Sequence, residues 1–214
     1  MDLVNLNTYS KKKYSQTGEE GILEHIFNQI GTTNKVAVEF GALDGSSLSN
    51  TRYFVDLGWK AIMFDGKTPP ASGVHCEFLT VENINAVFCK YGVPTEFDLL
   101  SIDVDGNDYW LWNALRYRPR VVIIEMNGTI HVGLNRTIPY NPTFACDGTD
   151  YYGASFGALK KLGESKDYTL IHQCHALNMF FVRSDIIPNM SFNITYTHNQ
   201  YHPHDTQNRP WVEV

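Results

Sequence analysis

Residues 36–45 read VAVEFGALDG, a short apolar run that ends in an acid and a glycine-rich turn. The run is β-branched and has no polar face, which predicts a parallel strand covered on both sides. Gly41 and Gly45 allow the backbone after the strand to turn and to approach a ligand closely. Glu39 stands at the carboxyl end of the strand, where open α/β sheets bind their ligands. The stretch therefore predicts a nucleotide-like ligand at this turn.

The composition indicates one α/β domain over residues 1–214. The formal net charge is −6 and the pI is about 5.7, which argues against a nucleic-acid partner. No apolar segment is long enough for a membrane span or a secretion signal. The four cysteines lack metal-ligand or disulfide spacing. These features favour a cytoplasmic protein with reduced thiols and no membrane partner; they do not indicate an oligomeric state.

Strand-like and helix-like segments alternate along the chain. Strands are expected near residues 35–40, 59–64, 74–79, 97–102, 120–125, 168–173 and 178–183. Helices are expected near residues 17–31, 49–57, 82–91, 108–115 and 155–165. Such alternation predicts a Rossmann-like, doubly wound, mostly parallel sheet of seven strands. The short link between the last two strands makes them a hairpin, so the last strand should be antiparallel.

Three regions have separate expected roles. Residues 14–183 are expected to form the core, with a proline-containing loop at 67–73. Residues 127–152 show no periodic pattern, and long loops in compact domains are often lids or binding loops. Residues 184–214 are polar and aromatic and should wrap the surface. The tail histidines His198, His202 and His204 fit no metal-ligand spacing and are expected on the surface.

Acidic residues stand at the carboxyl ends of four predicted strands. They are Glu39, Asp65, Asp103 with Asp105, and Glu125. Parallel strands bring these ends to one edge of the sheet, so the acids should line a ligand crevice.

Asp65, the turn after the first strand and the final hairpin help to identify the ligand expected in this crevice. Asp65 follows Glu39 by 26 positions, the range in which this fold places an acid on ribose hydroxyls. Asp65 followed by Gly66 is also a common turn. The sequence GALDG is not GxGxxG, so the pyrophosphate-binding pattern is incomplete. NAD and S-adenosylmethionine both remain open at this point, and the final hairpin favours S-adenosylmethionine.

The chain resembles the FkbM-like branch of class I S-adenosylmethionine-dependent methyltransferases. The resemblance covers about residues 14–183 and rests on an ordered set of short motifs. They are SQTGEE at 15–20, EFGALDG at 39–45, SNT at 49–51, GW at 58–59, SIDVDGNDYW at 101–110, IEMN at 124–127 and NMFFVR at 178–183.

The resemblance implies that Glu39, Gly41 and Ala42 hold the methionine part of the cofactor. It places Asp65 on the ribose, residues 79–82 beside the adenine, and Asp103 at the amino group or the reacting centre. The second strand ends in FDGKTPP, whereas family members commonly have a glutamate-led segment there. The full set of candidate cofactor-binding residues is Gln16, Glu39, Gly41, Ala42, Asp44, Asn50, Asp65, Gly66, Thr80 and Asp103.

Two mechanisms are compatible with these residues. In one, a general base takes a proton from the acceptor, and the candidates are Asp103, Asp105, Glu125, His131 and His175. In the other, Asp103, Glu125 and Asn127, with Asp105, supply oxygen ligands to a divalent ion such as Mg²⁺. Catechol-type O-methyltransferases have a similar ligand set.

The sequence predicts a methyltransferase, with O-methylation of a small hydroxylated or sugar-like acceptor as its reaction. Aromatic and hydrogen-bonding residues of the 127–152 loop suit such an acceptor. A non-catalytic binding or scaffold module with the same fold is the alternative. A nicotinamide-dependent oxidoreductase is disfavoured by the incomplete glycine pattern and by the final hairpin.

Overall fold

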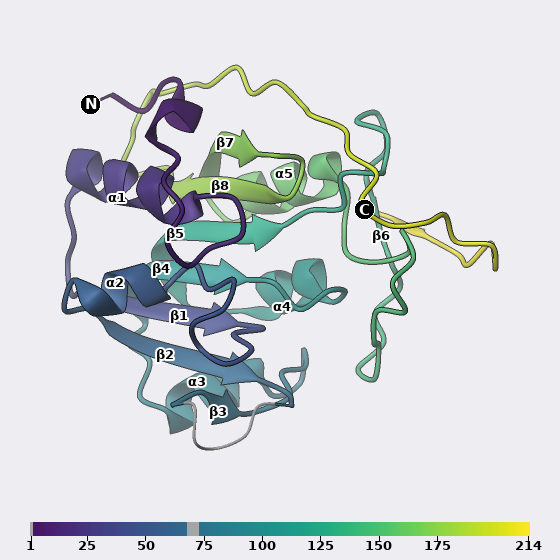
Figure 1. Cartoon of the computed structure of the whole chain (residues 1–214), viewed down its shortest axis with the longest axis horizontal. Coiled ribbons are helices and arrows are strands. Elements are labelled where there is room, and N and C mark those ends of the chain that lie inside the picture. The colour runs from purple at the N-terminus through teal and green to yellow at the C-terminus, as the bar shows by residue number, and fades with distance from the viewer. Residues whose placement is uncertain (1, 68–72) are drawn as a thin grey trace.

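The computed structural model describes residues 2–67 and 73–214 and contains a mixed sheet of seven strands. The strands are β1 (Val36–Phe40), β2 (Lys60–Asp65), β3 (His75–Cys76), β4 (Glu96–Ile102), β5 (Arg118–Glu125), β7 (Tyr168–Cys174) and β8 (Asn178–Arg183). Their order across the sheet is β3-β2-β1-β4-β5-β8-β7 (Figure 1). The strands β3, β2, β1, β4 and β5 run parallel to one another, and β8 is antiparallel to both β5 and β7. The predicted fold class is confirmed.

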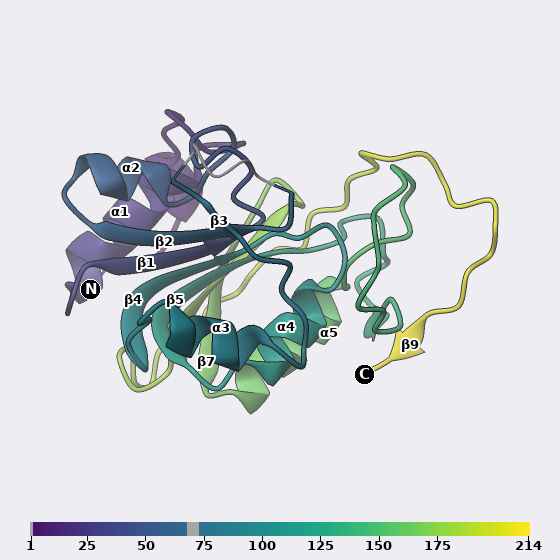
Figure 2. The same ribbon diagram turned by 90° about the horizontal axis from the view of Figure 1, so that it is seen from below.

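Helices cover both faces of the sheet. They are α1 (Glu19–Ile30), α2 (Arg52–Asp56), α3 (Ile84–Lys90), α4 (Asp108–Ala114) and α5 (Phe156–Ser165), after a short 3₁₀ helix η1 (Leu6–Tyr9). Figure 2 shows α1 and α2 on one face and α3, α4 and α5 on the other. Among the described residues, no helix combines the length and the apolar character needed to cross a membrane.

Alternate residues of the central strands enter two separate cores. Val38 and Phe40 of β1 pack with Phe88 of α3 on one face of the sheet. Ala37 packs with Ile26 of α1 on the opposite face. Because successive strand side chains point to opposite faces, an uninterrupted apolar run is what a strand buried on both sides requires.

Hydrogen bonds from side chains set several element boundaries. Ser155 Oγ accepts the N–H of Ala158 at 3.2 Å and caps α5. Ser15 Oγ accepts the N–H groups of Gly18 and Glu19, so α1 begins at Glu19, two residues after the predicted start. Such capping satisfies N–H groups that have no partner within the helix.

Two predicted elements differ from the structure, and a third cannot be compared with it. The helix predicted at 49–57 begins only at Arg52, because residues 49–51 bind the Glu39 carboxylate instead. The third strand, predicted over 74–79, is the two-residue β3. The predicted 67–73 loop lies largely outside the described residues.

The loop that precedes α5 and the C-terminal tail come together at one edge of the sheet. Strand β6 (Arg136–Thr137) pairs antiparallel with β9 (Val212–Glu213), a pairing that the sequence analysis did not predict. In Figure 1 the arrowheads of β1, β2, β4 and β5 point toward the edge where this loop and the tail lie. The tail also packs on the sheet, since Ile187 is buried in the core beside α1.

Candidate functional site

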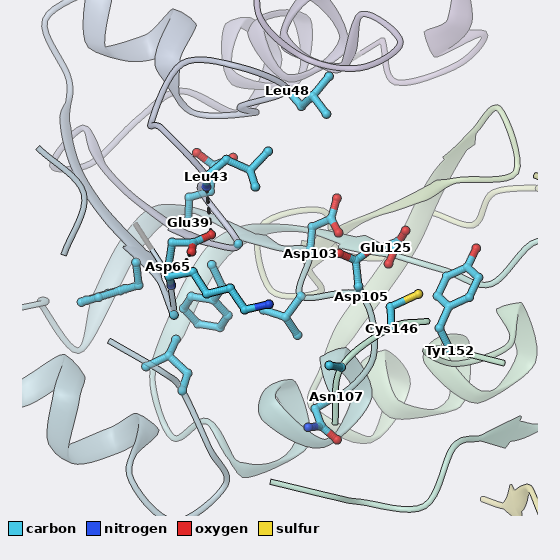
Figure 3. A pocket seen from close by; sticks show the side chains of 18 of the residues that line it. Glu39, Leu43, Leu48, Asp65, Asp103, Asp105, Asn107, Glu125, Cys146 and Tyr152 are labelled. Atoms are coloured by element: carbon cyan, nitrogen blue, oxygen red, sulfur yellow. Dashed lines mark hydrogen bonds between the residues drawn. The ribbon is translucent and has the colours of Figure 1, made fainter. Parts of the chain in front are cut away.

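A cavity of about 710 Å³ opens at the carboxyl ends of the parallel strands (Figure 3). Nine of the residues predicted for the site line it: Gln16, Glu39, Gly41, Asn50, Asp65, Gly66, Asp103, Asp105 and Glu125. They come from β1, β2, β4, β5 and the turns that follow these strands, together with the segment before α1. The parallel topology brings the strand ends to one edge, as expected for a doubly wound sheet.

Glu39 holds the segment between β1 and α2 in place. Its carboxylate accepts hydrogen bonds from Ser49 Oγ at 2.6 Å, the Asn50 N–H at 2.7 Å and Thr51 Oγ1 at 2.6 Å. Burial raises the pKa of Glu39, although these hydrogen bonds favour the ionised form. Since both carboxylate oxygens already have partners in the chain, Glu39 positions Asn50 and Leu48 at the cavity wall.

Asn50 presents an unsatisfied oxygen at this wall. Its amide nitrogen donates to Ser101 Oγ at 3.0 Å, whereas its Oδ1 is buried without a hydrogen-bond partner among the described residues. An unpaired buried acceptor costs about 1–3 kcal/mol, so a donor supplied by a ligand would relieve that cost.

Asp65 connects two turns beside the cavity. Its Oδ2 accepts the Leu43 N–H at 3.0 Å, drawn as a dashed line in Figure 3, and its Oδ1 accepts the Lys67 N–H at 2.8 Å. Each carboxylate oxygen has two lone-pair directions, so both oxygens retain the capacity to accept another hydrogen bond.

Large apolar side chains that remain partly exposed line the cavity. Leu43, Leu48 and Phe78 are 49%, 52% and 49% exposed. A Cβ atom on Gly66 would lie 2.7 Å from the Phe78 ring, so the glycine leaves room for that ring. Exposed apolar side chains that line one cavity are typical of a binding surface. Leu48 and Phe78 were not predicted as site residues, because sequence alone does not reveal which apolar side chains remain uncovered.

Asp103, Asp105 and Glu125, called the acidic triad below, lie at the ends of β4 and β5. One carboxylate oxygen from each lies within 4.8 Å of the others. Burial, reinforced by the neighbouring carboxylates, raises the pKa of Asp103 and of Glu125 well above the usual range. In Figure 3 the triad lies between Asp65 and Leu43 on one side and Cys146 and Tyr152 on the other.

Asp108 fixes the turn that carries Asp103 and Asp105. Its carboxylate accepts the N–H of Val104 at 2.8 Å and the N–H of Gly106 at 2.9 Å. Burial raises the pKa of Asp108 to about 6. Asp105 adopts a positive φ of 54° within this turn, a conformation that aspartate tolerates better than most residues.

Five predicted site residues lie elsewhere than in the cavity lining. Asn127 is fully buried: its amide donates to the carbonyls of Asp150 and Tyr152, and its Oδ1 accepts from Thr129. These hydrogen bonds give Asn127 a structural role and offer no support for its predicted role as a metal ligand. His131 is exposed, its Nδ1 accepts the Gly133 N–H at 3.0 Å, and it is not among the residues that line the cavity.

The other three shape turns near the cavity. The Asp44 carboxylate accepts the N–H groups of Ser46 and Ser47. The Thr80 N–H donates to Asn83 Oδ1 at 2.8 Å, just before α3. Ala42 is buried in a small apolar cluster with Met63. Their predicted cofactor contacts stay predictions, because the structure shows only these local roles.

The long loop and the tail supply further cavity residues. Phe144, Cys146 and Tyr152 come from the loop, which was predicted as a substrate or lid segment, and Tyr201 and His202 come from the tail. The Tyr201 hydroxyl donates to the carbonyl of His175 at 2.9 Å. His202 lines the cavity, although the sequence analysis placed it on the general surface.

No family model matches the sequence, and no curated protein matches it. Among solved structures, the chain is similar to the N-terminal domain of EvdMO1 in the presence of SAH and D-fucose. The TM-score is 0.44 at 12% identity, over 77% of this chain and 82% of that chain. The same domain with SAH bound gives 0.42 at 13% identity, over 77% and 79% of the two chains.

A third similar structure is the CMeT domain of the citrinin polyketide synthase. Its TM-score is 0.40 at 12% identity, over 81% of this chain and 52% of that chain. At these identities no site residue or ligand is transferred to this chain.

Proposed function

We propose that the protein is an S-adenosylmethionine-dependent methyltransferase that methylates an oxygen of a small hydroxylated or sugar-like acceptor. The division of the cavity between an apolar side and an acidic side carries this proposal. The cofactor has a flat, weakly polar adenosine part and a cationic part with a sulfonium and an ammonium group. Apolar contact therefore favours the adenosine part at the apolar side of the cavity, and opposite charge favours the cationic part near the acids.

The apolar side suits the adenosine part. Phe78 and Leu43 offer apolar surface to a purine, and Asp65 lies beside them at the end of β2. Its carboxylate can accept hydrogen bonds from the two ribose hydroxyls in addition to the two backbone N–H groups that it already binds.

The middle of the cavity suits the methionine part. Gly41 has a positive φ of 68° and presents its backbone at the cavity wall. Asn50 Oδ1, which lacks a partner among the described residues, matches an ammonium donor. Gln16 adds a further polar side chain from the segment before α1.

The acidic triad would receive the acceptor. The cofactor supplies an electrophilic methyl group, and the protein must align the acceptor oxygen and remove its proton. A carboxylate whose pKa is raised by burial is a stronger base than an ordinary carboxylate, which suits Asp103 and Glu125 for that step. Cys146 and Tyr152 face this part of the cavity and would contact the acceptor (Figure 3).

Calorimetric titration with S-adenosylhomocysteine tests the cofactor assignment. We expect one binding site per chain, weakened about tenfold or more by Asp65→Ala or Phe78→Ala through the loss of roughly 1.4 kcal/mol. A surface variant, Glu164→Gln on α5, should bind like the wild type. Binding of NAD in place of S-adenosylhomocysteine would support the oxidoreductase, and binding of neither would contradict the proposal.

Transfer of a labelled methyl group to a panel of phenols, sugars and hydroxy acids tests the reaction. We expect label in an ether product. Cofactor binding without transfer to any acceptor would favour the non-catalytic module.

A further inference from the structure

We propose that Asp103, Asp105 and Glu125 form a binding site for one divalent cation of the Mg²⁺ or Mn²⁺ type. The site does not depend on the methyltransferase assignment. Its role in activating an acceptor hydroxyl does rest on that proposed function.

The geometry of the acidic triad suits a small cation. Asp103 directly follows β4, Asp105 lies in the turn after it, and Glu125 ends the neighbouring parallel strand β5. A Mg²⁺ ion at about 2.1 Å from each ligand places neighbouring ligand oxygens roughly 3 Å apart and opposite ones about 4 Å apart. The triad oxygens lie within 4.8 Å of one another, so small side-chain rotations would bring them to these separations.

Glu125 supplies the observation that distinguishes this group from an ordinary acidic cluster. It is only 7% exposed, and its Oε2 is buried with no hydrogen-bond partner among the described residues. Burial of a carboxylate without a partner is costly, and buried charges in proteins are normally paired or bound to a metal.

Asp98, another buried acid of the same chain, shows how a buried carboxylate is usually stabilised by hydrogen-bond donors. It is fully buried, and its carboxylate accepts the N–H groups of residues 33–35 as well as a guanidinium N–H of Arg120. The fold thus supplies donors to Asp98 at the amino edge of the sheet. In the part of the chain that the structure describes, it supplies no donor to Glu125 Oε2 at the carboxyl edge, where the cavity lies.

The neighbours of the triad also favour a cation. The Asp108 carboxylate adds negative charge behind the turn and is itself held by two backbone N–H groups. Lys67 is the one lysine or arginine among the described residues that line the same cavity, so the lining offers little positive charge to neutralise the triad. The triad offers only oxygen ligands, which hard cations such as Mg²⁺ and Mn²⁺ prefer. Three of the four ligands that the sequence analysis named for a divalent ion, Asp103, Asp105 and Glu125, thus lie together in the structure.

In the proposed reaction, an acceptor hydroxyl bound to this cation would lose its proton more readily, because the positive charge lowers the hydroxyl pKa. With the cation bound, the triad would hold the ion and position the acceptor instead of acting as the general base, and water would take the proton.

Electron paramagnetic resonance of Mn²⁺ tests the site on the full chain, without cofactor. The signal of free Mn²⁺ falls when the ion binds, and we expect saturable binding of one ion per chain. Asp105→Asn and Glu125→Gln should each weaken binding about tenfold or more, since each removes a charged ligand. The control Glu164→Gln, which alters an exposed carboxylate on α5, should leave the affinity unchanged.

Asp105 is exposed, so Asp105→Asn should fold even if Glu125→Gln does not, and thermal unfolding will show which variants remain folded. Absence of saturable binding to the wild type would overturn the proposal. Undiminished binding to folded Asp105→Asn would overturn it as well. S-adenosylhomocysteine binding is measured in separate titrations without metal, so a failed cation site and a failed cofactor assignment are distinguishable.

Discussion

Gly41 lies so close to Asp103 that a Cβ atom at Gly41 would overlap the Asp103 carbonyl oxygen. The contact joins the turn after β1 to the end of β4, the two central strands of the cavity. The backbone at Gly41 also has φ +68°, which disfavours any residue with a side chain. Two separate physical requirements thus demand glycine at one position of the site.

Gly41→Ala should therefore separate the turn after β1 from β4. We expect a loss of stability well above the roughly 1–2 kcal/mol that a left-handed conformation alone costs, together with loss of S-adenosylhomocysteine binding. Gly92→Ala is the matched control, because Gly92 has φ +65° and no atom within 4 Å of the added Cβ. Urea unfolding and calorimetry measure both variants; equal destabilisation would show that the clash is relieved without cost.

Glu39 should act on the ligand through the 49–51 segment. Glu39→Ala removes the acceptors of three hydrogen bonds and should abolish S-adenosylhomocysteine binding. Glu39→Gln keeps an oxygen for the Asn50 N–H, and its amide can donate to the hydroxyl oxygens, so its affinity should fall far less. The double variant Ser49→Ala/Thr51→Val should weaken calorimetric binding as well. If only the Glu39 variants weaken it, the carboxylate contacts the ligand directly.

Asp98 should contribute to stability without affecting the cavity. Asp98→Ala leaves Arg120 and three backbone N–H groups without their acceptor, and breaking a buried pair costs about 3–5 kcal/mol. The exposed pair of Arg183 and Asp185 provides the comparison, and Asp185→Ala should cost about 1 kcal/mol or less. Urea unfolding measures both variants. A change in S-adenosylhomocysteine affinity of folded Asp98→Ala would contradict the separation of the two sheet edges.

His172 should make the stability depend on pH. It lies buried on β7, where its Nε2 is 3.0 Å from Asn7 Oδ1, and burial lowers its pKa from 6.5 to about 4. Between these values the unfolded chain binds a proton that the folded chain does not, so stability falls as the pH falls. The difference amounts to about 3 kcal/mol at and below pH 4.

The variant His172→Gln cannot titrate but keeps a side-chain N–H that can donate to Asn7. The free energy of unfolding, measured from pH 7 to pH 4, should therefore fall less steeply for the variant than for the wild type. Parallel curves would show that the pKa of His172 is the same in the folded and the unfolded chain, which would contradict the prediction.

The sheet could be predicted because each strand is indicated by a short, contiguous stretch of sequence. The apolar runs of β1, β4 and β5 and the acids at their ends follow from burial on both faces and from parallel topology. All three acids of the triad were predicted at strand ends for the same reason. Asp103 follows β4 and Glu125 ends the neighbouring β5, so their proximity follows from the order of the sheet.

The remaining site residues depend on contacts between distant segments. Asn127 follows β5 just as Asp105 follows β4, yet only Asp105 joins the triad, because the carbonyls of Asp150 and Tyr152 take up the Asn127 amide. Tyr201 reaches the cavity from a tail without helical or strand periodicity. No local pattern in the sequence encodes either outcome.

The pairing of β6 with β9 turns residues 184–211 into a closed loop, held by β8 at one end and by β6 at the other. A segment anchored at both ends remains at high effective concentration beside the cavity even when its own contacts open. Two residue pairs of a small sheet, remote from the central strands, therefore hold Tyr201 and His202 near the cavity, where ordering an untethered tail would cost more conformational entropy.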